Sequence, residues 1–249
     1  MRGSASTTDR CNIHDLFCRW SEINWNETID QKPAEVSNVV EVTEVFDFWA
    51  SKLSNSPVGK KLFPEIFMDC NMSINFACMG LYKYAYMSLR SELETALRLI
   101  YFEKHPVEYD WWTNGIEIDG ITSRRHVWGD NYKYFRYLDS VIEFHVSFKN
   151  KEILISQLSG TYAILSKYVH TSGTHFQTGN HRISPKFSEE AFNKWYDTFL
   201  KIQDAIMVFL ILEHKGIFQS ANASERERLL NKISYPKYRE RIKVMFQIS

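Results

Sequence analysis

Four polar side chains in one helical segment have the types that acid–base chemistry on a phosphate requires. The segment 79–105, MGLYKYAYMSLRSELETALRLIYFEKH, is expected to form one long helix. Arg90, Glu94 and Arg98 are spaced four residues apart and share one face of it, and His105 follows at its end. An imidazole transfers protons near neutral pH, and a guanidinium stabilises charge that develops on a phosphate. An Arg–His pair is therefore a candidate for RNA cleavage without a metal ion.

The same residues also have a structural interpretation. Glu94 can form an ion pair with either arginine, and a buried Arg–Glu–Arg set can specify how helices pack. His105 stands just before Pro106, where it can bind the last carbonyl groups of the helix. The sequence leaves both interpretations open.

His170 is a third candidate, at the end of the helix expected over 151–170. If this helix packs beside the first, His170 could approach Glu94 or Arg98. The Thr-Ser-Gly that follows His170 favours a histidine that caps its own helix instead.

No metal or cofactor is expected. Glycine-rich phosphate loops, serine nucleophile elbows and HExxH sequences are absent from the chain. A tryptophan-rich stretch could stack on bases or cover the end of a core. It holds Trp111, Trp112 and Trp128. Two sets of His and Cys residues lack the paired spacing of a zinc site, namely His170, His175 and His181, and Cys11, His14 and Cys18.

Composition excludes several classes of protein. With 44% hydrophobic and 15% aromatic residues, the 249-residue chain can build a sizeable core. Its 30 basic and 30 acidic residues balance, which gives no electrostatic reason for generic nucleic-acid binding. Four cysteines are few, as expected of a cytoplasmic protein. The most apolar run, 205–212, is much shorter than the roughly 20 residues of a membrane span, so no membrane partner is expected.

Hydrophobic periodicity predicts a mainly all-α fold. Three long helices are expected at 72–104, 151–170 and 188–215, and they should pack as a helical bundle. A small irregular or hairpin insertion is expected at about 107–131, where Asn-Gly and Asp-Gly pairs indicate turns. Shorter peripheral helices are expected at 39–53, 132–148, 224–233 and 235–246.

This pattern divides the chain into three parts. Residues 1–36 are expected to be a tail or a docking arm, 37–216 the bundle domain, and 217–249 a C-terminal helical extension. Expected helix boundaries are an N-cap at Ser188, a C-cap at Gly216, and a capping box formed by Ser224 and Glu227.

Two segments carry a resemblance to a known family. YMSLRSELETALRLIYFEKH (86–105), followed by YAILSKYVHTSG (162–173), resembles the HEPN-like helical domains of bacterial defence and abortive-infection proteins, over about residues 70–215. Ribonucleases of that superfamily are metal-independent, carry an Arg and a His with four to six residues between them, and pair two such motifs across a dimer. Arg98 and His105, with LIYFEK between them, satisfy this spacing.

The resemblance implies two functions. In the first, an anti-phage or toxin-type endoribonuclease would bind the scissile phosphate through Arg98 and transfer protons through His105, with His170 as a possible third group. In the second, the chain would be a non-catalytic helical subunit that binds a partner protein or RNA in a defence complex, as inactive members of the superfamily do. Either way, the expected partners are RNA, another protein or a second copy of the chain.

Overall fold

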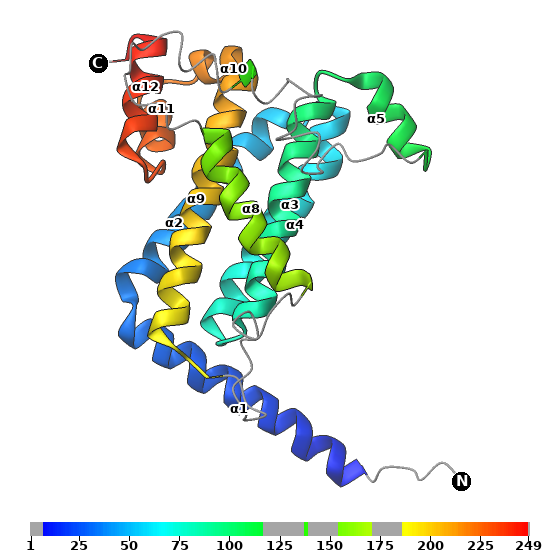
Figure 1. Ribbon diagram of the computed structural model, residues 1–249, viewed down its shortest axis with the longest axis vertical. Coiled ribbons are helices and arrows are strands. Elements are labelled where there is room, and N and C mark those ends of the chain that lie inside the picture. Colours follow the sequence, from blue (N-terminus) through cyan, green and yellow to red (C-terminus); the bar gives the residue numbers. More distant parts are fainter. Residues whose placement is uncertain (1–6, 117–136, 139–153, 171–185, 249) are drawn as a thin grey trace.

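The fold is entirely helical wherever it is described. The computed structural model describes residues 7–116, 137–138, 154–170 and 186–248, and these form ten helices and no strand (Figure 1). The prediction of an all-α bundle is confirmed. The helices are α1 Thr7–Gln31, α2 Pro33–Leu53, α3 Pro57–Cys78, α4 Tyr82–Phe102, α5 Pro106–Thr113, α8 Leu154–His170, α9 Glu189–Glu213, α10 Lys215–Ser220, α11 Ala223–Asn231 and α12 Pro236–Phe246.

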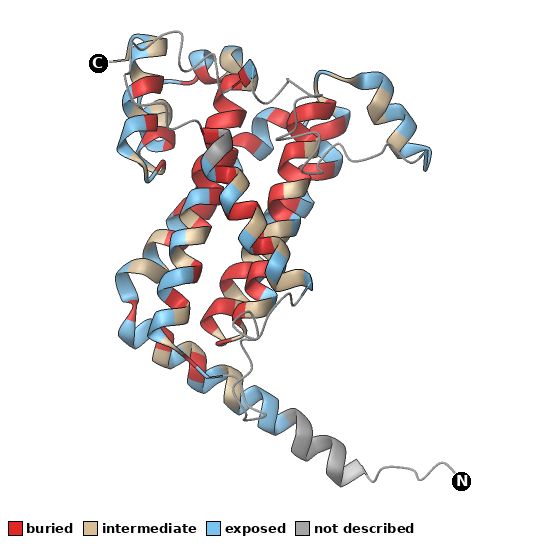
Figure 2. Ribbon diagram, viewed as in Figure 1, coloured by how far each residue is buried: buried red, intermediate tan, exposed pale blue. Residues whose placement is uncertain are grey.

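Helix α4 lies at the centre of the bundle. It packs against α3, α8 and α9, and α2 packs against α3. Figure 2 shows the buried residues on the faces that these helices turn toward one another. The apolar run 205–212 is buried along its whole length in α9. A helix segment that is apolar on all sides is expected to lie in a core. None of the described helices has the length and apolar character that a membrane span needs.

The prediction of one long helix at 72–104 is wrong, because the chain turns at Gly80. Helix α3 ends at Cys78 and α4 begins at Tyr82. Gly80 has φ +73°, and the N–H groups of Gly80 and Leu81 bond back to carbonyls of the last turn of α3. This is a Schellman motif, which strongly favours glycine at its left-handed position. A Cβ at Gly80 would also lie 2.8 Å from the backbone of Lys186, at the entrance to α9.

The start of α9 agrees with the prediction, and its end does not. Ser188 caps α9 as expected, since its Oγ accepts a hydrogen bond from the Ala191 N–H at 3.3 Å. Gly216 is not the C-cap, because α9 ends before His214 and Gly216 lies inside α10. The chain remains helical there after a single non-helical residue.

The capping box of α11 lies two residues earlier than expected. Asn222 and Glu225 form it, with two reciprocal hydrogen bonds of 2.9 Å, in place of Ser224 and Glu227. Asn222 and Ser224 both have side chains suited to an N-cap, and each stands three residues before a glutamate, so the sequence did not distinguish them.

The start of the expected insertion is a helix, not a hairpin. Residues 106–113 form α5, and Trp112 packs on Phe102 with ring centroids 5.4 Å apart. The rest of the insertion lies outside the described residues, as do nearly all of the helix expected at 132–148 and the loop with His175 and His181.

The C-terminal extension shares the core of the bundle. Asp204 of α9 accepts hydrogen bonds from the Ser234 N–H at 2.6 Å, the Ser234 hydroxyl at 2.7 Å and the Tyr235 N–H at 2.9 Å. Buried Phe218 and Ile242 belong to the same hydrophobic cluster as the bundle helices. The carboxylate of Asp204 thus anchors the start of α12 to α9.

Replacing Gly80 by Ala should lower the free energy of unfolding more than replacing Gly115 by Ala. Both glycines have positive φ, +73° and +74°, but a Cβ at Gly115 would meet nothing within 4 Å. Left-handed backbone alone costs an L-residue roughly 1–2 kcal/mol, and Gly80→Ala adds the clash with Lys186. Urea denaturation of both variants measures the difference. Equal losses would show that the Lys186 segment moves aside freely.

Candidate functional site

Arg90 and Glu94 form a structural network with Tyr162 of α8. Arg90 Nε donates to Glu94 Oε1 at 2.9 Å, and the Tyr162 hydroxyl donates to the same oxygen at 2.8 Å. Arg90 Nη2 lies 3.3 Å from the Tyr162 oxygen. Burial raises the pKa of Tyr162, and Glu94 beside it raises that pKa further, so the hydroxyl keeps its proton. Half-buried Arg90 and Glu94 and buried Tyr162 together hold α4 to α8.

His105 is held against the last turn of α4. Its Nδ1 is 2.7 Å from the Tyr101 carbonyl oxygen, and its ring stacks on the Tyr101 ring at a centroid distance of 3.8 Å. This is the carbonyl contact that the structural interpretation of His105 expects. Arg98 is half-buried on α4.

The structure places His170 at the opposite end of α4 from Arg98. Helices α4 and α8 run antiparallel, because Tyr162 meets Arg90 while Tyr168 stacks on Tyr86 at 3.9 Å. His170 is exposed two residues beyond Tyr168. Since Tyr86 and Arg98 are twelve residues apart on one helix, they lie about 18 Å apart along its axis. His170 therefore does not join the Arg98–His105 end.

A buried carboxyl group that sequence reasoning missed lies on the core face of α4. Glu92 is completely buried and accepts a hydrogen bond from Gln203 Nε2 of α9 at 2.7 Å. The same amide nitrogen is 3.8 Å from the sulfur of Cys70 in α3. Burial raises the pKa of Glu92 to about 8, so this acid is mostly protonated at neutral pH. Glu92 follows Leu89 by three residues and precedes Ala96 by four, which places it on the apolar stripe of the helix. This position was the signal in the sequence for a buried carboxyl group.

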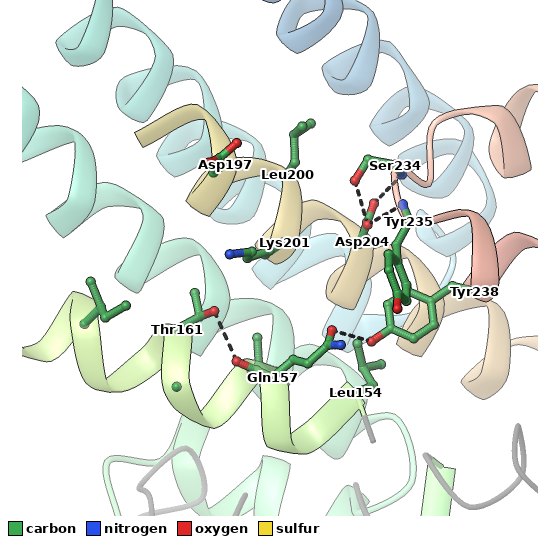
Figure 3. A pocket seen from close by; sticks show the side chains of 13 residues that line it. Leu154, Gln157, Thr161, Asp197, Leu200, Lys201, Asp204, Ser234, Tyr235 and Tyr238 are labelled. Carbon is green, nitrogen blue, oxygen red and sulfur yellow. Dashed lines mark hydrogen bonds between the residues drawn. The ribbon is translucent and has the colours of Figure 1, made fainter. Parts of the chain in front are cut away.

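A groove of about 680 Å³ opens between α8, α9 and the start of α12 (Figure 3). Its walls are mainly apolar, with Leu158 and Leu200 from the two long helices and Tyr238 from α12. The Tyr238 hydroxyl donates to Gln157 Oε1 at 2.7 Å, which ties α12 to α8. The full lining is Leu154, Gln157, Leu158, Gly160, Thr161, Ile164, Asp197, Leu200, Lys201, Asp204, Ser234, Tyr235 and Tyr238.

The charged groups of the groove divide into two kinds. Asp204 is buried and committed to the start of α12, and burial raises its pKa against the hydrogen bonds that lower it. Asp197 and Lys201 are exposed on successive turns of α9. They give the groove one negative and one positive group on the same side, suited to a partner with paired charges.

No group of three or more His, Cys, Asp or Glu side chains among the described residues is arranged to hold a metal ion. Cys70 and Cys78 are buried free thiols, and burial raises the pKa of Cys78 to about 12. Neither thiol is in the thiolate form that metal binding or nucleophilic attack needs.

No family model matches the chain, and comparisons with curated proteins and with solved structures found no match either. The resemblance to HEPN-like domains therefore rests on the quoted segments alone. Function has to be inferred from the geometry of the chain.

Replacing Glu92 by Gln should remove a pH-dependent part of the stability. Between the ordinary pKa of 4.5 and the folded value of about 8, the folded chain keeps a proton that the unfolded chain has lost. Glu92 therefore makes the free energy of unfolding fall as pH rises through this window, by up to a few kcal/mol. Relative to the wild type, the Gln variant should gain stability between pH 5 and pH 8.5 in urea denaturation.

The matched control for this experiment is Glu190→Gln on the surface of α9. Glu190 is exposed beside Lys194, which lowers its pKa, so folding does not make it retain a proton as Glu92 does. A difference between Glu92→Gln and wild type that stays constant with pH would show that Glu92 is ionised in the folded chain.

Proposed function

We propose that this chain is a non-catalytic helical binding subunit, and that its groove between α8, α9 and α12 holds an amphipathic helix of a protein partner. The observation that carries the proposal is Gly160, in the middle of α8. It lines the groove, and a Cβ there would meet nothing within 4 Å.

Packing among the described residues gives no reason for glycine at this position. Glycine in a helix interior costs about 0.5–1 kcal/mol relative to alanine, and here alanine would fit. A glycine in a groove wall allows the backbone of a second helix to approach closely, as small residues do between packed helices. Gly160 is thus explained by an occupant of the groove.

The walls suit the apolar face of a helix. Ile164 is 44% exposed beside Gly160, and Leu158, Leu200 and Tyr235 continue the apolar surface along the groove. Helix-in-groove recognition uses anchors at positions i, i+3, i+4 and i+7, which such a surface can bury together. Charged Asp197 and Lys201 at the side supply direction and specificity.

The candidate nuclease residues support a non-catalytic role. Arg90 and Glu94 are engaged with Tyr162, and His105 is stacked on Tyr101. Each contact serves helix packing or a helix end. Under the resemblance to HEPN-like domains, the chain would be a partner-binding subunit of a defence complex.

A fluorescein-labelled amphipathic Leu/Lys/Glu peptide of about 18 residues, five helical turns, is a suitable probe of the groove. It should bind the full chain saturably in fluorescence anisotropy, and Gly160→Leu should weaken binding at least about tenfold, or 1.4 kcal/mol. Gly160→Ala should bind nearly as the wild type does.

The matched control is Gly216→Leu. Gly216 is also an exposed helical glycine with open space at its Cβ position, but it does not line the groove. A peptide of the same composition without amphipathic order should not bind. Equal binding by wild type and Gly160→Leu would place the peptide elsewhere and contradict the proposal.

An endoribonuclease is the second candidate, because one contact also suits catalysis. The Tyr101 carbonyl accepts from His105 Nδ1–H, which assigns the basic lone pair to Nε2, the arrangement of an oriented general base. For a non-catalytic chain, purified wild type and the Arg98→Ala/His105→Ala double variant should give the same background cleavage of a structured RNA in EDTA. Cleavage by the wild type that both single variants abolish would establish the nuclease instead.

A further inference from the structure

Helix α1 has a docked half and a projecting half. The docked half is fixed to the bundle by Asn24, whose Oδ1 accepts from the Phe187 N–H at 2.8 Å, and by Thr28, whose hydroxyl donates to the Cys78 carbonyl at 3.1 Å. The N-terminal half extends away from the bundle (Figure 1), and its described residues are largely exposed (Figure 2).

The projecting half carries an apolar stripe. Leu16 and Ile23 are 44% and 60% exposed, and half-buried Trp20 lies between them. Their spacing of i, i+4 and i+7 is the anchor pattern of helices that bind in grooves. Phe17, 58% exposed, lies on one flank of the stripe. Large apolar side chains gathered in this way on a soluble protein mark an interaction surface.

We propose that the projecting half of α1 from a second copy of this chain fills the groove between α8, α9 and α12. This inference rests on the proposed function and names its partner. The stripe supplies apolar anchors that the apolar walls of the groove can bury, and Gly160 allows the α1 backbone of the second copy to lie close to α8.

Charge complementarity supports this occupant and sets its direction. Asp15 and Arg19 are exposed four residues apart beside the stripe, on the flank opposite Phe17. Asp197 and Lys201 have the same spacing on α9. With α1 antiparallel to α9, Arg19 faces Asp197 and Asp15 faces Lys201, whereas a parallel helix would oppose like charges.

When two copies exchange their α1 arms reciprocally, they form a closed dimer. Each copy has one arm and one groove on separate parts of its surface, so two copies related by a two-fold axis can satisfy both arms and both grooves. The exchange adds no strain to the bundle, because the docked half of α1 keeps its contacts through Asn24 and Thr28.

Sedimentation equilibrium on the full chain tests this dimer. The wild type should be dimeric at micromolar concentration, and Gly160→Leu or Arg19→Glu should raise the dimer dissociation constant at least about tenfold. Asp197→Arg alone should weaken the dimer similarly. Combining Arg19→Glu with Asp197→Arg should restore it, because the reversed pair attracts again. Gly216→Leu is the control that should remain dimeric.

Three outcomes would overturn the inference. They are a monomeric wild type, a dimer that Gly160→Leu leaves intact, and charge reversals that fail to rescue one another. A monomeric wild type whose groove still binds the amphipathic probe peptide would leave the proposed function standing with a different protein as partner. A groove that binds neither the probe nor a second copy would contradict both the proposed function and the proposed dimer.

Discussion

The position of α4 between α3, α8 and α9 is the constraint on which the rest of the structure depends. Two polar contacts on different faces of α4 fix its rotation and its axial position. Glu92 on the core face meets Gln203 of α9, and Arg90 and Glu94 on another face meet Tyr162 of α8. A buried polar group without its partner costs about 1–3 kcal/mol, so a shift of α4 by one residue would break both sets. Apolar contacts alone tolerate such shifts more readily.

The groove is a consequence of these contacts. Tyr162 holds α8 to α4, and Asp204 anchors the start of α12 to α9. Tyr238 then connects α12 back to Gln157 of α8. Because hydrogen bonds connect all three walls, the groove is preformed, and a helix that enters it does not have to order the walls first.

Sequence patterns predicted the helices better than the polar chemistry. Periodicity located the core helices, and the Arg90–Glu94 pair follows from a spacing of four along one helix. The prediction of one helix at 72–104 missed the turn at Gly80, where the close approach of Lys186 comes from a distant part of the chain. The burial of Glu92 is explained by its hydrogen bond with Gln203, which is 111 residues away in the sequence. The groove combines α8, α9 and α12, so no local pattern could indicate it.

Two local costs of this chain point to the same explanation. The exposed stripe of Leu16 and Ile23 keeps apolar surface in water, and Gly160 weakens a helix that alanine would strengthen. Neither cost is offset by a contact described within one copy. In the proposed dimer both costs are offset, because the stripe is buried and the missing Cβ leaves space for the incoming backbone. The proposed dimer thus explains the exposed arm and the open groove as two halves of a single interface.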